Sequence, residues 1–580
     1  MNKQEFKNFV KEQIIFLDVA TGSNLQKRGM PSGVCPELWI AEHKEVLMGL
    51  QQEYVEAGSN IVYAPTFSAN RIKLEGYGLQ DRAEELNKTL VAISKEAVGD
   101  KALVAGDLTM TGELLAPVGT LDFEELIDIY KEQISYLVQA GVDLLIVETM
   151  MSLQECRAAL IAAKETAPSL PVMVTMTFEE SGKTLYGTDA VTAAVVLESL
   201  GADAIGVNCS TGPEKMVNVV KNIVAVTNVP VIAKPNAGLP KLNEQGQTVY
   251  EMDAPEFGEK MQLLADAGAT ILGGCCGTTP AHIKALADTV HYPEKKIRRR
   301  PEGMSYLTSE RKTVAFGKED PVIVIGERIN PTGKSDLMEE FADGDFFTLE
   351  DLAQEQEDSG AHLLDINCGM PGIDEKETML LALEAAAGVT KLPLVIDSFD
   401  RNVLEAALRR YPGRALVNSV TAQADKLEKL LPVVAKYGAM FIILPITDAG
   451  VPADLEEKKA IISNICERAL ELGMRKEDIV ADGLVTSLAV NPDAASEAVE
   501  LIRFCKDMGL LSVCGISNIS FGMPNRSLLN SVFLNLAVSA GLNMAIMNPC
   551  QKEMDTALCC ANLFAGKEDA VADYLDHIRE

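Results

Sequence analysis

Short apolar runs rich in Val, Ile and Leu alternate with longer stretches of helical periodicity along residues 1–300. Such runs are typical of parallel strands buried on both faces, and the stretches between them predict helices. Eight runs end near Asp18, Tyr63, Gly106, Glu148, Met176, Asn208, Lys234 and Gly274. Eight strand and helix units predict a (β/α)8 barrel, whose active site would lie at the carboxyl ends of the strands.

The same rhythm resumes after residue 320. Strand-like runs there end near Glu327, Asn367, Asp397, Asn418, Pro445, Asp482, Ser517 and Asn548. Period counting alone does not separate closed barrels from open sheets, but the repeated count of eight favours barrels. We therefore predict an α/β protein with two (β/α)8 (TIM) barrels in tandem, one over residues 1–291 and one over residues 321–580.

Residues 292–320 lose the periodicity and are interpreted as an inter-domain linker. They contain a basic run at 295–300, which could instead be a targeting signal or a nucleotide-binding patch. The surrounding chain is so acidic that a solvated linker is the favoured interpretation.

Charge and composition exclude several classes of function. The formal net charge of -32 would repel nucleic acid and anionic lipid, which bind chiefly through Lys and Arg. The N-terminus has no apolar signal region, and no run is long enough to span a membrane. We therefore expect a cytoplasmic protein, in which most of the twelve cysteines are core residues, metal ligands or catalytic thiols.

Three cysteines stand at the ends of two predicted strands of the first domain. Cys209 ends one run, and Cys275 and Cys276 end another, with glycines on both sides of the pair. The sixth and eighth strands of a barrel are near neighbours at the rim, so the three thiols can converge. Three thiolates with an open fourth position are typical of a catalytic zinc, which would deprotonate a thiol substrate and make it nucleophilic.

Two other interpretations of these cysteines stay open at this point. His282, six residues beyond Cys276, could complete a structural site as a fourth ligand. The cysteines could also be small buried hydrophobic residues. The pair at Cys559 and Cys560 provides a contrast, because it lies in a glycine-free helical pattern and is interpreted as packing.

The segments around Cys209 and Cys275–Cys276 resemble the zinc motifs of the homocysteine S-methyltransferase family. Further segments resemble this family at 16–23, 63–67, 146–149 and 234–238. The resemblance implies that homocysteine is bound by Asp18, Gly22, Ser23, Thr66 and Glu148, with Glu148 on the substrate ammonium. It also implies that Asn236 lends its amide oxygen to zinc until the thiol arrives. Val19 departs from the family, which usually has glycine after the aspartate.

The predicted strands of the second domain end on acids and amides instead of a Cys or His cluster. These polar ends lie at 326–333, 365–367, 396–398, 417–419, 481–483 and 515–522. Asp accepts hydrogen bonds whereas Asn both donates and accepts, so the set suits a heterocycle with many N–H and C=O groups, such as a pterin. Any one of these residues could be a helix N-cap, but several together favour a binding site.

The set resembles the pterin-binding domain shared by dihydropteroate synthases and methyltetrahydrofolate:corrinoid methyltransferases. The Gly-Glu-Arg-Ile-Asn sequence at 326–330 resembles the second group specifically. By this resemblance, 5-methyltetrahydrofolate would be held by Glu327, Asn330, Asp397, Asn418, Asp482, Asn518 and Arg526. Asn518 is the candidate for a catalytic hydrogen bond to the methyl-bearing nitrogen of the folate, and no residue is assigned as the proton donor.

Together the two domains resemble the N-terminal modules of the cobalamin-dependent methionine synthase family. The resemblance implies methyl transfer from 5-methyltetrahydrofolate through cobalamin, which itself supplies the nucleophile, to zinc-bound homocysteine. The chain has no Asp-x-His-x-x-Gly motif. We therefore expect a corrinoid-binding module or protein outside this chain, because the sequence is either truncated or served by a separate carrier.

Two alternatives belong to other functional classes. A homocysteine barrel fused to a flavin-dependent methylenetetrahydrofolate reductase would share substrates, but its second barrel should not carry Gly-Glu-Arg-Ile-Asn. A non-catalytic protein that binds folate and zinc would place four protein ligands around the metal.

Overall fold

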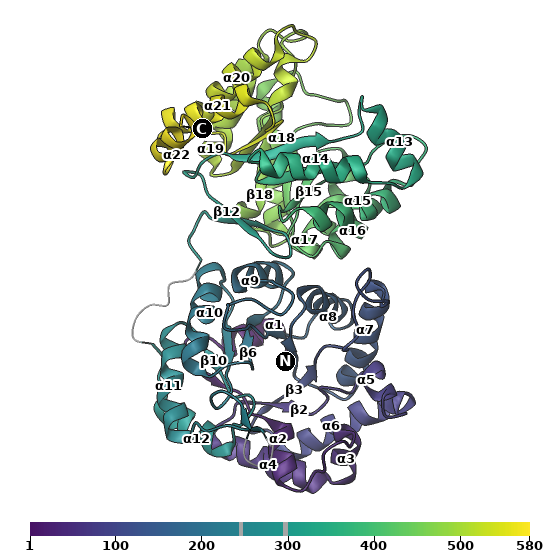
Figure 1. Ribbon diagram of the computed structural model, residues 1–580, viewed down its shortest axis with the longest axis vertical. Coiled ribbons are helices and arrows are strands. Elements are labelled where there is room, and N and C mark those ends of the chain that lie inside the picture. Colours follow the sequence, from purple (N-terminus) through teal and green to yellow (C-terminus); the bar gives the residue numbers. More distant parts are fainter. Residues whose placement is uncertain (243–247, 294–299, 580) are drawn as a thin grey trace. The chain divides into compact units, whose positions relative to one another are not determined.

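The computed structural model of the protein describes residues 1–242, 248–293 and 300–579. The chain divides into two units, Met1–Pro301 and Glu302–Glu580. In each unit helices surround eight parallel strands, so the prediction of two tandem (β/α)8 barrels is confirmed (Figure 1). Of the basic run at 295–300, only Arg300 lies within the described residues. None of the helices in these ranges combines the length and apolar character that a membrane span requires.

The first barrel has the strand order β1-β10-β7-β6-β5-β4-β3-β2, and a parallel bridge between Leu17 and Ile61 joins its two outer strands. Its strands are β1 (Ile15–Phe16), β2 (Ile61–Ala64), β3 (Leu103–Leu108), β4 (Leu144–Met150), β5 (Val172–Met176), β6 (Ala204–Asn208), β7 (Val231–Lys234) and β10 (Ile271–Leu272). A short pair, β8 (Lys241–Leu242) and β9 (Thr248–Val249), follows β7. The observed strand ends lie within a few residues of the predicted ones.

The helices of the first unit pack around the strands. They are α1 (Lys3–Phe9), α2 (Thr21–Lys27), α3 (Pro36–Glu42), α4 (Lys44–Ala57), α5 (Arg71–Glu75), α6 (Ala83–Val98), α7 (Phe123–Gln139), α8 (Leu153–Thr166), α9 (Ala190–Ser199), α10 (Pro213–Val226), α11 (Ala254–Asp266) and α12 (Pro280–Thr289). Helix α1 precedes the barrel and packs against its amino end. Phe6 is fully buried in one cluster with Ile61, Leu144 and other first residues of strands.

The second barrel is closed in the sequential order β13 to β20. Its strands are β13 (Ile323–Ile329), β14 (Leu363–Asn367), β15 (Leu394–Asp397), β16 (Leu416–Thr421), β17 (Met440–Leu444), β18 (Ile479–Asp482), β19 (Leu511–Gly515) and β20 (Met544–Met547). Its helices are α13 (Ser335–Asp343), α14 (Phe347–Asp358), α15 (Glu375–Val389), α16 (Arg401–Arg410), α17 (Ala424–Tyr437), α18 (Leu455–Glu471), α19 (Ala494–Met508), α20 (Arg526–Ala540), α21 (Lys552–Phe564) and α22 (Ala570–His577). Cys559 and Cys560 lie in α21, as their helical pattern predicts.

Part of the segment expected to be a linker at 292–320 is folded. Strands β11 (Ser305–Thr308) and β12 (Thr313–Phe316) form an antiparallel hairpin within the second unit. Leu307 and Phe316 are buried in the same cluster as residues of the barrel interior, including Ile323. The two strands flank the polar stretch 309–312 and each has a polar residue at one end or both, so they lack the continuous apolar run that marks the barrel strands.

A buried ion pair fixes the hairpin to the barrel. Arg414 donates hydrogen bonds to the Tyr306 carbonyl at 3.1 Å and to an Asp478 carboxylate oxygen at 2.7 Å. The Arg414 backbone N–H also donates to the Thr308 hydroxyl at 2.8 Å. One guanidinium therefore ties β11 to the loops that precede β16 and β18.

Candidate functional site

The three predicted thiols of the first barrel come together. Cys209 directly follows β6, and Cys275 and Cys276 follow β10. Their sulfur atoms all lie within 4.8 Å of one another. Cys209 has a left-handed backbone, with φ of 64°, an uncommon conformation for a residue with a side chain. Three soft donors at this spacing form a set that can hold one zinc ion.

Neighbouring loops hold the thiols in place. The backbone N–H of Cys275 donates to the Pro235 carbonyl at 2.8 Å, and the side-chain oxygen of Asn236 accepts a hydrogen bond from the Cys276 backbone. On the other side, the amide nitrogen of Asn24 in α2 donates to the Thr278 carbonyl at 2.9 Å. Asn24 was not among the predicted site residues, because its partner is 254 positions away.

Tyr250 is another site residue that the sequence did not indicate. Hydrogen bonds from the Cys209 and Cys275 thiols, and to a smaller extent from the Tyr250 hydroxyl, lower the pKa of Cys276 to about 3. The Tyr250 ring lies over Gly277, where an added Cβ would be 2.4 Å from the ring. Glycine after the cysteine pair is therefore needed for the tyrosine to approach.

His282 does not join the thiols. Its Nδ1 accepts a hydrogen bond from the Thr279 backbone N–H at 3.2 Å, and its Nε2 lies 3.1 Å from the Met252 carbonyl. Both ring nitrogens are thus used at the start of α12, and the group of possible metal ligands found in the described residues contains the three cysteines without this histidine. The alternative of His282 as a fourth ligand is not supported.

Three of the residues predicted to bind the amino acid lie at or just beyond the carboxyl ends of β1, β2 and β4. Asp18 is buried, accepts a hydrogen bond from the Tyr63 backbone N–H at 2.8 Å, and has its pKa raised to about 7 by burial. Glu148 at the β4 end accepts from the Lys234 ammonium at 3.0 Å. The Thr66 hydroxyl donates to the Asp107 carbonyl at 2.8 Å.

The remaining two predicted residues, Gly22 and Ser23, lie in the first turn of α2. Gly22 is exposed, and the Ser23 hydroxyl is buried without a hydrogen-bond partner in the protein. An unsatisfied buried hydroxyl is costly, so a bound polar group would stabilise it.

In the second barrel, hydrogen bonds join polar residues from different strand ends. The Ser517 hydroxyl donates to Glu327 at 2.7 Å. The Asn367 amide donates to Asp397 at 2.9 Å, and the Asn418 amide donates to Asp365 at 3.2 Å. Asp365, Asn367 and Ser517 therefore belong to this group, although they were not among the residues assigned to the pterin.

Burial raises the pKa of the acids in this second group. The pKa rises to about 6 for Asp397 and to about 7 for Asp482, and it also rises for Glu327. Asp482 accepts a hydrogen bond from the Leu484 backbone N–H at 2.7 Å. Carboxyl groups that titrate near neutral pH can accept or donate, which suits a heterocycle with both kinds of edge.

Three further predicted residues lie just after β13, in the short helix that follows β19, and at the start of α20. Asn330 caps a turn by accepting from the Thr332 backbone N–H at 2.9 Å. Asn518 is in the short helix η3 (Ile516–Ser520) that follows β19. Arg526 donates to the Ser517 carbonyl at 2.8 Å, so it supports the same loop.

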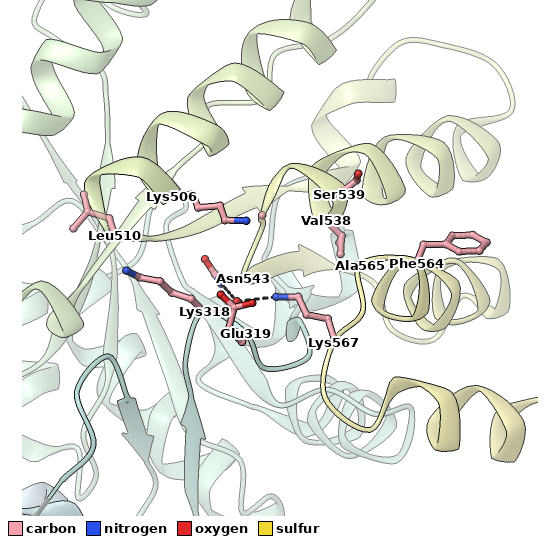
Figure 2. A pocket seen from close by; sticks show the side chains of 11 residues that line it. Lys318, Glu319, Lys506, Leu510, Val538, Ser539, Asn543, Phe564, Ala565 and Lys567 are labelled. Carbon is pink, nitrogen blue, oxygen red and sulfur yellow. Dashed lines mark hydrogen bonds between the residues drawn. The ribbon is translucent and has the colours of Figure 1, made fainter.

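A pocket of about 260 Å3 lies at the opposite end of the second barrel. It is lined by residues that precede β19 and β20, including Leu510 and Asn543 (Figure 2). Lys567 and Asn543 both donate to the Lys318 carbonyl there, at 2.8 and 3.3 Å. Barrel enzymes carry their chemistry at the carboxyl ends of the strands, so we do not assign this pocket to the pterin.

Comparison with known proteins divides the chain in the same way. Residues 15–290 match the family model of homocysteine S-methyltransferase, and residues 326–548 match that of pterin binding enzymes. The first unit thus resembles homocysteine S-methyltransferases and the second resembles pterin binding enzymes, and the first of these matches supports a methyltransferase.

Over nearly its whole length the chain is similar to methionine synthases. It is 30% identical to the methionine synthase of Mycobacterium tuberculosis over 575 residues, which cover 93% of this chain and 48% of that protein. It is 29% identical to the methionine synthase of Mycobacterium leprae, covering 93% of this chain and 47% of that one. The chain therefore spans about half the length of these relatives.

Among solved structures, the oxidized form of the homocysteine methyltransferase MmuM from Escherichia coli shares 22% identity. The match covers 50% of this chain and 99% of that one, with a TM-score of 0.42. No functional conclusion is based on this likeness.

Proposed function

We propose that this chain catalyses methyl transfer from 5-methyltetrahydrofolate, through a corrinoid bound by a module or protein outside this chain, to homocysteine, giving methionine. The observation that carries the proposal is the convergence of Cys209, Cys275 and Cys276 at the carboxyl end of the first barrel. The same chain holds a second barrel whose strand ends offer acids and amides to a pterin.

Zinc fits the first site. The three thiols offer soft donors within 4.8 Å of one another. Cys209, Cys275 and Cys276 would hold the ion, and Asn236 would offer its amide oxygen. When bound, zinc supplies a site at which a thiol loses its proton and becomes a nucleophile.

The residues around the thiols would bind and orient the amino-acid end of the substrate. Asp18 and Glu148 present carboxylates for the ammonium group. Gly22 and Ser23, in the first turn of α2, and Thr66, in the loop after β2, would also bind the substrate, as the family resemblance implies. The buried position of Asp18 and Glu148 strengthens each charge-assisted bond by keeping water out.

In the second barrel the chain would hold the pterin by its edges. Asp482, Asp397 and Asn418 offer acceptors and donors at three strand ends. Glu327, Asn330 and Arg526 support the surrounding loops, and Asn518 would donate to the nitrogen that carries the methyl group. A corrinoid supplies the methyl-accepting nucleophile by its own chemistry. We also propose that the protein works in the cytoplasm, where its twelve free cysteines stay reduced.

The two half-reactions test this function separately. Zinc-loaded protein should form methionine from added methylcobalamin and homocysteine, and should form methylcobalamin from cob(I)alamin and methyltetrahydrofolate. Cys276→Ala should abolish the first reaction and leave the second unchanged, whereas Asp482→Asn should weaken the second and spare the first. Failure of both reactions in fully zinc-loaded protein would refute the proposal.

A further inference from the structure

Tyr250 lies beside the three-thiol group of the first barrel, on the segment that follows β9. Val249 pairs with Lys241 in the β8–β9 hairpin, and Tyr250 comes next in the chain. Its ring lies over Gly277, where an added Cβ would be 2.4 Å from the ring Cγ. Gly277 has φ of 84°, which favours glycine for a second reason. The tyrosine therefore packs on the turn that directly follows Cys276.

Hydrogen bonds anchor the backbone just beyond Tyr250. The Met252 backbone N–H donates to the Ala237 carbonyl at 3.2 Å, and the Met252 carbonyl lies 3.1 Å from Nε2 of His282. Because Nδ1 of His282 accepts from the Thr279 backbone N–H, Nε2 carries the ring proton and donates to Met252. Both backbone groups of Met252 are thus held, two positions from Tyr250.

The loop after β7 connects this segment to the cysteine pair. The Ala237 N–H donates to the Cys276 carbonyl at 3.0 Å, and the Ala237 carbonyl accepts from the Met252 N–H at 3.2 Å. One residue thus binds the backbone of Cys276 with one group and the segment of Tyr250 with the other. The protein itself therefore sets the position of Tyr250 relative to Cys276.

The Tyr250 hydroxyl is hydrogen-bonded to the Cys276 sulfur. The Cys209 and Cys275 thiols also donate to this sulfur. Thiols lose their protons when they bind zinc as thiolates, so these two donors would no longer be available in a zinc-loaded site. A phenol keeps its proton at neutral pH. Of these three donors, Tyr250 is therefore the one that remains for Cys276 beside a metal.

A hydrogen bond to a metal ligand has two physical effects. It fixes the orientation of the ligand, and residues that do so typically change metal affinity by about 10- to 100-fold. It also draws electron density from the sulfur, because the positive end of the O–H dipole lies against it. Both effects act through the Cys276 sulfur, so Tyr250 would influence a bound metal without being a ligand.

We propose that Tyr250 is a positioning residue of the metal site, which holds the Cys276 sulfur through its hydroxyl. Met252, fixed by Ala237 and His282, keeps the tyrosine in place. His282, which the sequence left open as a fourth ligand, takes this supporting role instead. The inference rests on the proposed function and deepens it, because the site that Tyr250 serves is the proposed zinc site.

Tyr250→Phe tests the proposal, because it removes the hydroxyl and keeps the ring over Gly277. Zinc affinity, measured by competition with a chelator, should fall about 10-fold or more. In protein loaded with cobalt(II) instead of zinc, the sulfur-to-cobalt charge-transfer absorption should move to longer wavelength, since a sulfur without the hydrogen bond gives up an electron more readily. His282→Ala should shift the same band in otherwise wild-type protein and have no further effect in Tyr250→Phe.

Tyr77→Phe is the matched control, because Tyr77 lies in the same barrel with half of its surface exposed. It should change neither the zinc affinity nor the cobalt spectrum. Either an unchanged affinity or an unchanged absorption in Tyr250→Phe, or an equal change in Tyr77→Phe, would overturn the assignment of Tyr250. A further shift from His282→Ala in Tyr250→Phe would overturn the supporting role of His282. Wild-type protein that binds neither zinc nor cobalt(II) would instead refute the proposed function, and this inference with it.

Discussion

The side-chain oxygen of Asn236 accepts a hydrogen bond from the backbone N–H of Cys276, at 3.0 Å. A second bond runs alongside it, from the Ala237 N–H to the Cys276 carbonyl, also at 3.0 Å. The loop after β7 thus holds both the backbone N–H and the backbone carbonyl of Cys276. The orientation of the Cys276 thiol depends on Asn236 whether or not the amide contacts a metal.

Asn236→Ala should weaken zinc binding by about 10- to 100-fold, because residues that orient metal ligands typically have effects of this size. Competition with a chelator of known affinity would measure the change. X-ray absorption of the thiol-free protein should also show an altered zinc shell. Asn222→Ala, an exposed change in the same barrel, is the control. An unchanged shell and affinity in Asn236→Ala would contradict both roles of the amide.

The two adjacent cysteine pairs should behave differently towards metal. Cys276→Ser should lower the zinc content of purified protein well below one ion per chain, since a thiolate ligand is lost. Cys560→Ser should retain zinc, because Cys560 lies in α21 of the second barrel. Metal analysis of the two variants checks this expectation, and equal zinc content in both would exclude the three-thiol site.

Folate binding should depend on pH through Asp482. Burial raises the pKa of this carboxyl from 3.8 to about 7. The neutral form therefore stabilises the fold fully below about pH 4, and this contribution is lost as pH rises through 7. A pterin N–H needs the ionised form, so methyltetrahydrofolate affinity should fall below pH 7, by up to about tenfold per pH unit.

Binding titrations between about pH 5.5 and 8 check this dependence. Asp482→Asn should bind folate more weakly at pH 8 and show a much flatter pH profile, because its amide does not titrate. A variant with the same slope as wild-type protein would assign the dependence to another group, such as Asp397, whose pKa is raised to about 6.

The ion pair beneath the second barrel should be important for stability. Burial alone would raise the pKa of Asp478, but Arg414 and Arg475 outweigh it and lower the pKa to about 2. Asp478→Asn leaves the buried Arg414 charge unpaired and should destabilise this barrel by about 3–5 kcal/mol. Because the folded pKa is depressed, the stabilisation is present above about pH 4 and lost as pH falls towards 2.

Urea denaturation would measure the loss of stability in Asp478→Asn, and hydrogen exchange would show which unit it affects. Exchange should accelerate in the second unit and stay unchanged in the first. Asp425→Asn removes an exposed partner of Lys429 and should change stability by less than about 1 kcal/mol. If both variants lost the same free energy of unfolding, the buried ion pair of Asp478 would be no more stabilising than an exposed one.

The barrels could be predicted from the sequence because each buried parallel strand is a short, continuous run of apolar residues. The apolar run 144–147 begins β4, and Glu148 follows it two residues before the strand ends at Met150. Cys209 and the Cys275–Cys276 pair were found for the same reason, since the strand number places them at neighbouring positions on one rim.

Other site residues depend on contacts that no local pattern reveals. Lys234 was recognised as a strand end, but its pairing with Glu148 joins positions 86 apart. Tyr250 reaches Cys276 only because a short hairpin follows β7. The hairpin at 305–316 was missed because polar and charged residues separate its two short apolar segments, so no continuous apolar run stands out.

Helix α1 and the β11–β12 hairpin have the same consequence: they limit the side from which reactants can reach each barrel. Each packs against the apolar interior of its barrel, which side chains fill, so ligands of each barrel would bind only at the carboxyl ends of the strands. In the proposed reaction, folate and corrinoid would both have to approach the carboxyl ends of the strands of the second barrel. If the docked corrinoid covers the folate, spent folate leaves only after the corrinoid withdraws, and withdrawal of the carrier becomes a step of every turnover.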